Sequence, residues 1–147
     1  MDNRKKYELV IIGGGSAGST AAKWAARRGI SVALVERDKL GGTCLNYGCD
    51  PTKALLHAAG LLHAAKASAP LGLRFPEAGF DWTAVMAHIR ELIDSIRGGD
   101  PEDAAERQEE RGIDVIRGEA SFISPREIRV DEDVIPVSYT HLTLPTN

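Results

Sequence analysis

The sequence lacks the features that mark membrane proteins and nucleic-acid-binding proteins. No segment approaches the roughly 20 consecutive apolar residues that a membrane span needs. The formal net charge of −3 gives no excess of positive charge to attract nucleic acid or anionic lipid. We therefore expect neither a membrane nor a nucleic acid as a partner.

Cysteine is scarce as well, with only Cys44 and Cys49 in the chain. The first residues are basic and then apolar, as in a signal peptide, but the glycines at 13–15 end the apolar run too early. We therefore expect a cytoplasmic protein. In that reducing compartment, a cysteine pair is more typical of catalysis or metal binding than of a structural disulfide.

What the sequence does contain is the composition of a soluble globular protein, with 43% hydrophobic and 27% charged residues. A chain of 147 residues can bury one core but cannot hold two complete domains.

The first forty residues carry the pattern of a βαβ unit. A short β-branched run at 9–12 precedes a glycine cluster and an alanine-rich helical stretch at 17–28. Gly29 is placed as the residue that ends this helix, and a second β-branched run at 31–35 stops at Glu36. This order predicts an α/β fold with a parallel, Rossmann-like sheet.

The rest of the chain predicts three more helices, a third parallel strand and a small antiparallel meander. Proline at a first helical position and aspartate at an N-cap mark the helix starts, and proline or glycine marks their ends. The expected elements are a helix from Pro51 to residue 69, a helix capped by Asp81 and ending near Arg97, a helix starting at Asp100 and ending near Gly112, a strand at 113–116 and the meander at 119–137.

The last eleven residues, 137–147, differ in character from the chain before them. Charge disappears, and the string VSYTHLTLPTN is similar to a translated sequencing-library adapter. We expect a non-native tail that should be excluded from fold and site reasoning, His141 included. A genuine short tail is the alternative.

The glycines at 13, 15 and 18 form the spacing G-x-G-x-x-G between the first strand and helix. Gly13 allows the tight turn, Gly15 lets a pyrophosphate approach the backbone, and Gly18 removes a side chain where helix and strand pack. Glu36, at the end of the second strand, is placed to bind the adenosine ribose, or else is a solvated strand end. The spacing alone does not separate FAD from NAD.

Residues 41–53 read GGTCLNYGCDPTK. This string resembles the motif G-G-T-C-x-N-x-G-C-x-P-[ST]-K of the pyridine nucleotide-disulfide oxidoreductases, which include dihydrolipoamide dehydrogenase, glutathione reductase and mercuric reductase. Together with GGGSAG at 13–18 and GEASF at 118–122, the resemblance covers nearly everything from Tyr7 to Val134.

The resemblance implies FAD as the cofactor and Cys44 and Cys49 as the redox-active pair. It places Cys49 toward the flavin, Cys44 toward the substrate and Lys53 near the flavin ring. It also places the following residues against FAD, mostly through their backbones: Ser16, Ala17, Gly42, Thr43 and Ala120.

For an intact enzyme, the resemblance implies electron transfer between NAD(P)H, FAD, the cysteine pair and a small-molecule disulfide or metal-ion substrate, in a homodimer. Residues 1–136 then correspond to the N-terminal part of an FAD-binding domain, truncated before completion. The NAD(P)H and interface domains are absent, so we expect the fragment to be inactive alone.

The physical chemistry of the cysteine motif also favours a thiolate. Cys49 precedes the expected helix start at Pro51, and Lys53 lies about one turn further along, so that both the helix N-terminus and the cation favour a charged sulfur. Asp50 stands where the family usually has an apolar residue. A neighbouring anion opposes thiolate formation, and the sequence leaves the direction of its side chain open.

Several alternatives remain at this point. The chain could be the dinucleotide-binding module of an NAD-dependent dehydrogenase without disulfide chemistry, or a misfolded product of a truncated gene with exposed sheet edges. The two cysteines could be ordinary thiols. A zinc site with His57 and His63 fits no usual spacing, so we expect no metal site.

Overall fold

A computed structural model describes residues 6–76 and 78–137. His141 and the remainder of the expected tail after Val137 lie outside the described residues. The backbone N–H of Val137 itself donates to the Arg126 carbonyl at 2.9 Å, and its side chain packs against the meander.

The centre of the fold is a parallel sheet in the order β1-β2-β3. The strands are β1 (Leu9–Ile12), β2 (Val32–Glu36) and β3 (Ile113–Arg117), and β2 pairs with both of the others. Because β2 is central and covered on both faces, its apolar run is continuous rather than alternating, and Val32 to Val35 are all buried.

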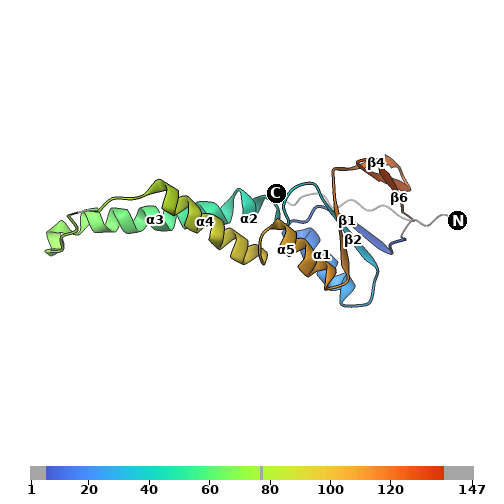
Figure 1. Ribbon diagram of the computed structural model, residues 1–147, viewed down its shortest axis with the longest axis horizontal. Coiled ribbons are helices and arrows are strands. Elements are labelled where there is room, and N and C mark those ends of the chain that lie inside the picture. Colours follow the sequence, from blue (N-terminus) through green and yellow to red (C-terminus); the bar gives the residue numbers. More distant parts are fainter. Residues whose placement is uncertain (1–5, 77, 138–147) are drawn as a thin grey trace.

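Two helices cover one face of this sheet, and a second sheet covers the other (Figure 1). Helices α1 (Ser16–Ala26) and α5 (Pro101–Glu109) pack small alanines onto Leu34 and Ile113. The opposite face, with Val35, packs against an antiparallel meander of β4 (Ala120–Ser124), β5 (Glu127–Val130) and β6 (Asp133–Pro136). The predicted fold class is therefore confirmed.

Between β2 and α5 the chain leaves this body as a helical arm (Figure 1). It consists of α2 (Gly42–Asn46), α3 (Cys49–Ala67), the short 3-10 helix η1 (Ala69–Leu71) and α4 (Trp82–Arg97). The base of the arm is held by a small core of Leu45, Ile89 and Ile93. Among the described residues, no helix has the length and apolar character to cross a membrane.

The predicted caps are confirmed, whereas one predicted helix start is wrong. The Asp81 carboxylate accepts hydrogen bonds from two N–H groups at the start of α4, and Asp100 does the same for α5. Helix α3 begins at Cys49 rather than at Pro51, and the sequence patterns did not reveal α2. Cys49 is therefore inside the first turn of a helix and not ahead of it.

Candidate redox and dinucleotide site

The turn between β1 and α1 has the geometry that its glycines predict. Gly13 has a φ of +99°, in the region that favours glycine, and its N–H donates to the Val35 carbonyl at 2.8 Å. A Cβ on Gly18 would lie 1.9 Å from the Gly13 carbonyl oxygen. Gly18 is thus required for the close packing of helix and turn.

The start of α1 is open to a ligand. Its N-cap is Gly15, which offers no side-chain cap, and Ser16 and Ala17 in the first turn are exposed. The first N–H groups of a helix have no acceptor within the helix and carry a partial positive charge. This helix end therefore suits a phosphate.

Glu36 lies against the same turn. Its carboxylate accepts a hydrogen bond from the Gly14 N–H at 2.7 Å and another from the Asp38 N–H at 2.9 Å. Glu36 is half-buried, and each of its oxygens retains a further lone pair. Glu36 thus lies at the glycine turn, as expected for a residue that binds the adenosine ribose. Its carboxylate also holds the backbone of the turn through these hydrogen bonds.

The cysteine motif contacts this turn through its two leading glycines. The Gly41 N–H donates to the Gly14 carbonyl at 2.8 Å. A Cβ on Gly42 would approach the Gly15 Cα to 2.8 Å, and Gly42 has a φ of +67°. Glycine at position 42 is therefore required for the two backbones to lie this close, whereas a Cβ on Gly41 would meet the Leu45 side chain at 2.4 Å.

Cys44 and Cys49 are exposed free thiols on two different helices, α2 and α3. Their side chains are hydrogen-bonded to each other, and this bond is the largest cause that raises the pKa of the Cys44 thiol above its ordinary value. Desolvation, the charge of Cys49 and the charge of Asp50 raise the Cys44 pKa further, while a backbone hydrogen bond lowers it. This bond therefore favours the protonated form of Cys44.

Asp50 lies where its charge can act on the cysteine pair. Asp50 is half-buried in the first turn of α3, and its charge acts on the Cys44 thiol. Lys53 is exposed one turn beyond Cys49 on the same helix.

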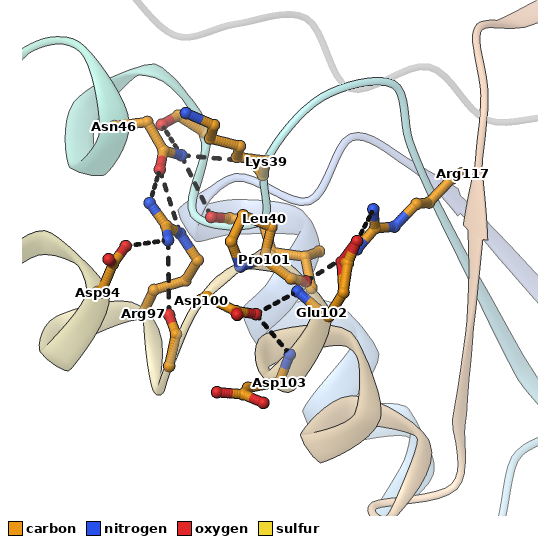
Figure 2. A network of polar contacts seen from close by, with 12 residues as sticks. Lys39, Leu40, Asn46, Asp94, Arg97, Asp100, Pro101, Glu102, Asp103 and Arg117 are labelled. Atoms are coloured by element: carbon orange, nitrogen blue, oxygen red, sulfur yellow. Dashed lines mark hydrogen bonds and ion pairs between the residues drawn. The ribbon is translucent and has the colours of Figure 1, made fainter. Parts of the chain in front are cut away.

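A partly buried polar network that the sequence patterns did not reveal fixes the cysteine loop to α4 (Figure 2). The Asn46 side-chain oxygen accepts from Arg97 Nη2 at 2.6 Å and Nε at 3.2 Å. The Asn46 amide donates to three backbone carbonyls of the loop before and within α2, those of Lys39, Leu40 and Gly42. In the sequence, Asn46 is marked only by its match to the asparagine of the motif that residues 41–53 resemble, and no pattern marks Arg97.

Tyr47, which also lies between the cysteines, makes a second side-chain contact. The Tyr47 hydroxyl donates to the Asp38 carboxylate at 2.6 Å, which raises the Tyr47 pKa above its ordinary value. The loop is therefore anchored by the side chains of both Asn46 and Tyr47.

Other predicted residues lie further from this centre. Ala120 begins β4 and packs against the meander core; it follows Gly118, whose N–H donates to the Glu36 carbonyl at 3.1 Å. His57 and His63 are exposed along α3. Over the described ranges, no three His, Cys, Asp or Glu side chains come together to hold a metal ion.

Fold and site together define a class of protein, in which a βαβ unit with a glycine-rich turn contacts the loop that carries a thiol pair. Comparison with known families agrees, because residues 7–142 match the model of the pyridine nucleotide-disulphide oxidoreductases. The chain belongs to this family, and the alternative of a dehydrogenase module without disulfide chemistry is not favoured.

The curated relatives include dihydrolipoyl dehydrogenases, a glutathione reductase and mercuric reductases. The chain is 37% identical over 128 residues to a dihydrolipoyl dehydrogenase of Acholeplasma laidlawii, with 86% of the chain and 37% of the relative covered. It is 38% identical over 130 residues to a glutathione reductase of Schizosaccharomyces pombe, with 86% of the chain and 27% of the relative covered. With a mercuric reductase of Lysinibacillus sphaericus the identity is 33% over 129 residues, with 88% of the chain and 23% of the relative covered.

Among solved structures, the chain is similar to the Cu(II) complex of the HOCl-induced flavoprotein disulfide reductase RclA from Escherichia coli. The TM-score is 0.67 at 32% identity, and the likeness covers 91% of this chain and 27% of that one. The chain thus spans roughly a quarter to a third of the length of these relatives.

Proposed function

We propose that this chain is the N-terminal part of an FAD-binding domain and that Cys44 and Cys49 are its redox-active pair. The observation that carries the proposal is the contact of Gly14 with Gly41 and of Gly15 with Gly42. These contacts hold the open start of α1 next to the loop that carries the two thiols. A dinucleotide whose pyrophosphate meets α1 therefore lies next to the cysteine loop.

The residues present fit FAD. The close approach of Gly15 and Gly42 leaves the turn free of side chains where the pyrophosphate would pass. Glu36 offers its remaining lone pairs to the ribose hydroxyls, and Ser16, Ala17 and Thr43 are exposed around the opening. Gly13 and Gly18 shape the turn, while Lys53 and Ala120 belong to the same proposal on the family resemblance.

When bound, FAD supplies a two-electron carrier between a nicotinamide and the cysteine pair. The chain's own part is the dithiol: Cys44 and Cys49 together release two protons and two electrons as their S–S bond forms, and take them up again as it breaks. In the reduced pair, the hydrogen bond to Cys49 favours the protonated form of Cys44. A negative charge on the sulfur of Cys49 would lie in the first turn of α3, where the free N–H groups of the helix and Lys53 would stabilise it.

For the whole protein, we propose electron transfer between NAD(P)H and a small-molecule disulfide or metal-ion substrate, in the cytoplasm. The names of the relatives, which include glutathione and mercuric reductases, support both substrate classes. The NAD(P)H and interface domains would lie outside residues 1–136, which agrees with the share of each relative that the chain spans.

A homodimer is part of the same proposal, and the helical arm supports it. Helix α3 has no buried residue, and an apolar groove of about 830 Å³ runs between α3, α4 and the segment joining them. Contiguous exposed apolar surface of this kind marks an interface. We propose that a second copy of the chain occupies this groove. Analytical ultracentrifugation of the chain tests this. Leu61→Ser in the groove should weaken self-association, whereas Trp24→Ser on α1 should not.

The test of the proposed function is a titration of the purified chain with FAD and, separately, with NAD⁺. Saturable FAD binding with quenching of flavin fluorescence, and weak binding of NAD⁺, is the expected result. Tighter binding of NAD⁺ than of FAD would overturn the proposal in favour of a dehydrogenase module.

A further inference from the structure

Arg97, the last residue of α4, has its side chain almost entirely buried, with only 4% exposed. A buried guanidinium is costly unless its charge is paired and its donors are bonded. Here Asp94 accepts from Nη1 at 2.6 Å, and Asn46 accepts from Nη2 and Nε at 2.6 and 3.2 Å. The planar fork of arginine, which lysine lacks, is what allows both bonds to Asn46.

Asn46 transmits this anchorage to the redox loop. Its amide bonds the Lys39, Leu40 and Gly42 carbonyls, so that the side chain joins Arg97 to the backbone that leads into α2 (Figure 2). Cys44 lies in α2 two residues before Asn46, and Cys49 lies three residues after it at the start of α3. The approach of the two sulfurs therefore depends on how α2 is held relative to α3 and α4.

We infer that Arg97 is a positioning residue that sets the thiol–disulfide equilibrium of Cys44 and Cys49 by fixing Asn46. The inference rests on the proposed function, because it assumes that the pair is redox-active. Arg97 touches neither sulfur and acts through the loop alone. Loosening the loop lowers the effective concentration of one thiol toward the other, which disfavours the intramolecular disulfide.

The experiment equilibrates the full chain, without flavin, in buffers of glutathione and glutathione disulfide. Two protein thiols become one S–S bond, while one glutathione disulfide becomes two glutathiones. Acid quenching and alkylation, read by mass spectrometry, give the oxidised fraction. In Arg97→Met we expect the equilibrium constant for the intramolecular disulfide to fall about tenfold, which is about 30 mV.

Two further variants separate positioning from general stability. Arg97→Lys keeps the charge beside Asp94 but loses the fork, and should show a similar fall while remaining folded. Arg117→Met removes another arginine fork, which is bonded to Glu102 of α5 at 2.7 and 3.1 Å and not to the cysteine loop, and should leave the equilibrium unchanged. If Arg97→Met does not fold, Arg97→Lys decides the matter.

The possible failures are distinguishable. If the unaltered pair forms no intramolecular disulfide at any glutathione ratio, the proposed redox function fails together with this inference. If the pair does form and both Arg97 variants match the unaltered chain, or if Arg117→Met shifts the equilibrium equally, only the role of Arg97 is overturned.

Discussion

The backbone N–H of Gly41 donates to the carbonyl oxygen of Gly14 over 2.8 Å, and this bond joins two motifs that lie 27 residues apart, 14 to 41, in the chain. The glycine-rich turn after β1 and the cysteine loop are therefore one structural unit. A change that separates the two backbones should disturb nucleotide binding and thiol chemistry together.

Gly42→Ala tests this unit directly. Its Cβ would lie 2.8 Å from the Gly15 Cα, in addition to the cost of about 1–2 kcal/mol for a left-handed alanine. Gly112→Ala is the matched control, because Gly112 has a similar φ of +77° but nothing within 4 Å of a Cβ. Urea unfolding should show a larger loss for Gly42→Ala, and FAD titration should show weakened binding only there. Equal losses in both variants would mean that the two loops do not need this contact.

Gly18→Ala should destabilise the fold by about 2–4 kcal/mol, because its Cβ would lie 1.9 Å from the Gly13 carbonyl oxygen. The control is Gly60→Ala in the middle of α3, where nothing lies within 4 Å. There the higher helix propensity of alanine should stabilise by up to about 1 kcal/mol. Thermal unfolding of the two variants should move in opposite directions, and a neutral Gly18→Ala would contradict the packing described for α1.

Glu36→Ala should weaken FAD binding by about 1.5–3 kcal/mol, because a charged acceptor for the ribose is lost. Glu36→Gln keeps one acceptor oxygen and should lose less. Because Glu36 also holds the Gly14 and Asp38 N–H groups, both variants must be shown to remain folded by circular dichroism. Unchanged FAD affinity in folded Glu36→Ala would remove this residue from the site.

Asp50→Asn should lower the pKa of Cys44, since the Asp50 charge is one of the causes that raise it. The thiolate is the form that reacts, so the pH at which Cys44 reaches half its maximal alkylation rate should fall. Peptide mass spectrometry separates Cys44 from Cys49. Glu109→Gln, an exposed change on α5, should not move this pH. A rise after Asp50→Asn would show that its carboxylate has another effect on the loop.

The parts of the structure that the sequence could predict are those set by neighbours in the chain. The glycine spacing, the strand and helix periods and the Asp81 and Asp100 caps are local signals, and each element they predict is present. Helix α2 has only five residues and follows two glycines, so its local pattern is that of a loop. The start of α3 was misplaced because Pro51 suits a first helical position, although the first turn also accepts proline two residues further in.

The site was predictable as motifs but not as contacts. Arg97 and Asn46 are 51 residues apart, and no residue pattern links an arginine at the end of one helix to an asparagine in a distant loop. The same holds for the contact of Gly15 with Gly42, and for the effect of the Asp50 charge on Cys44. These relationships depend on how the base of the helical arm packs against the glycine turn and how α4 packs against the cysteine loop.

The visible spectrum of the FAD-loaded chain tests most directly whether a flavin lies beside the Cys44 and Cys49 pair. We predict a long-wavelength charge-transfer band after reduction of the pair with dithiothreitol. The band should be present without reductant in Cys44→Ser, where the remaining thiol has no internal partner, and absent in Cys49→Ser. A band that persists in Cys49→Ser, or a reduced chain with bound FAD and no band, would contradict the claim.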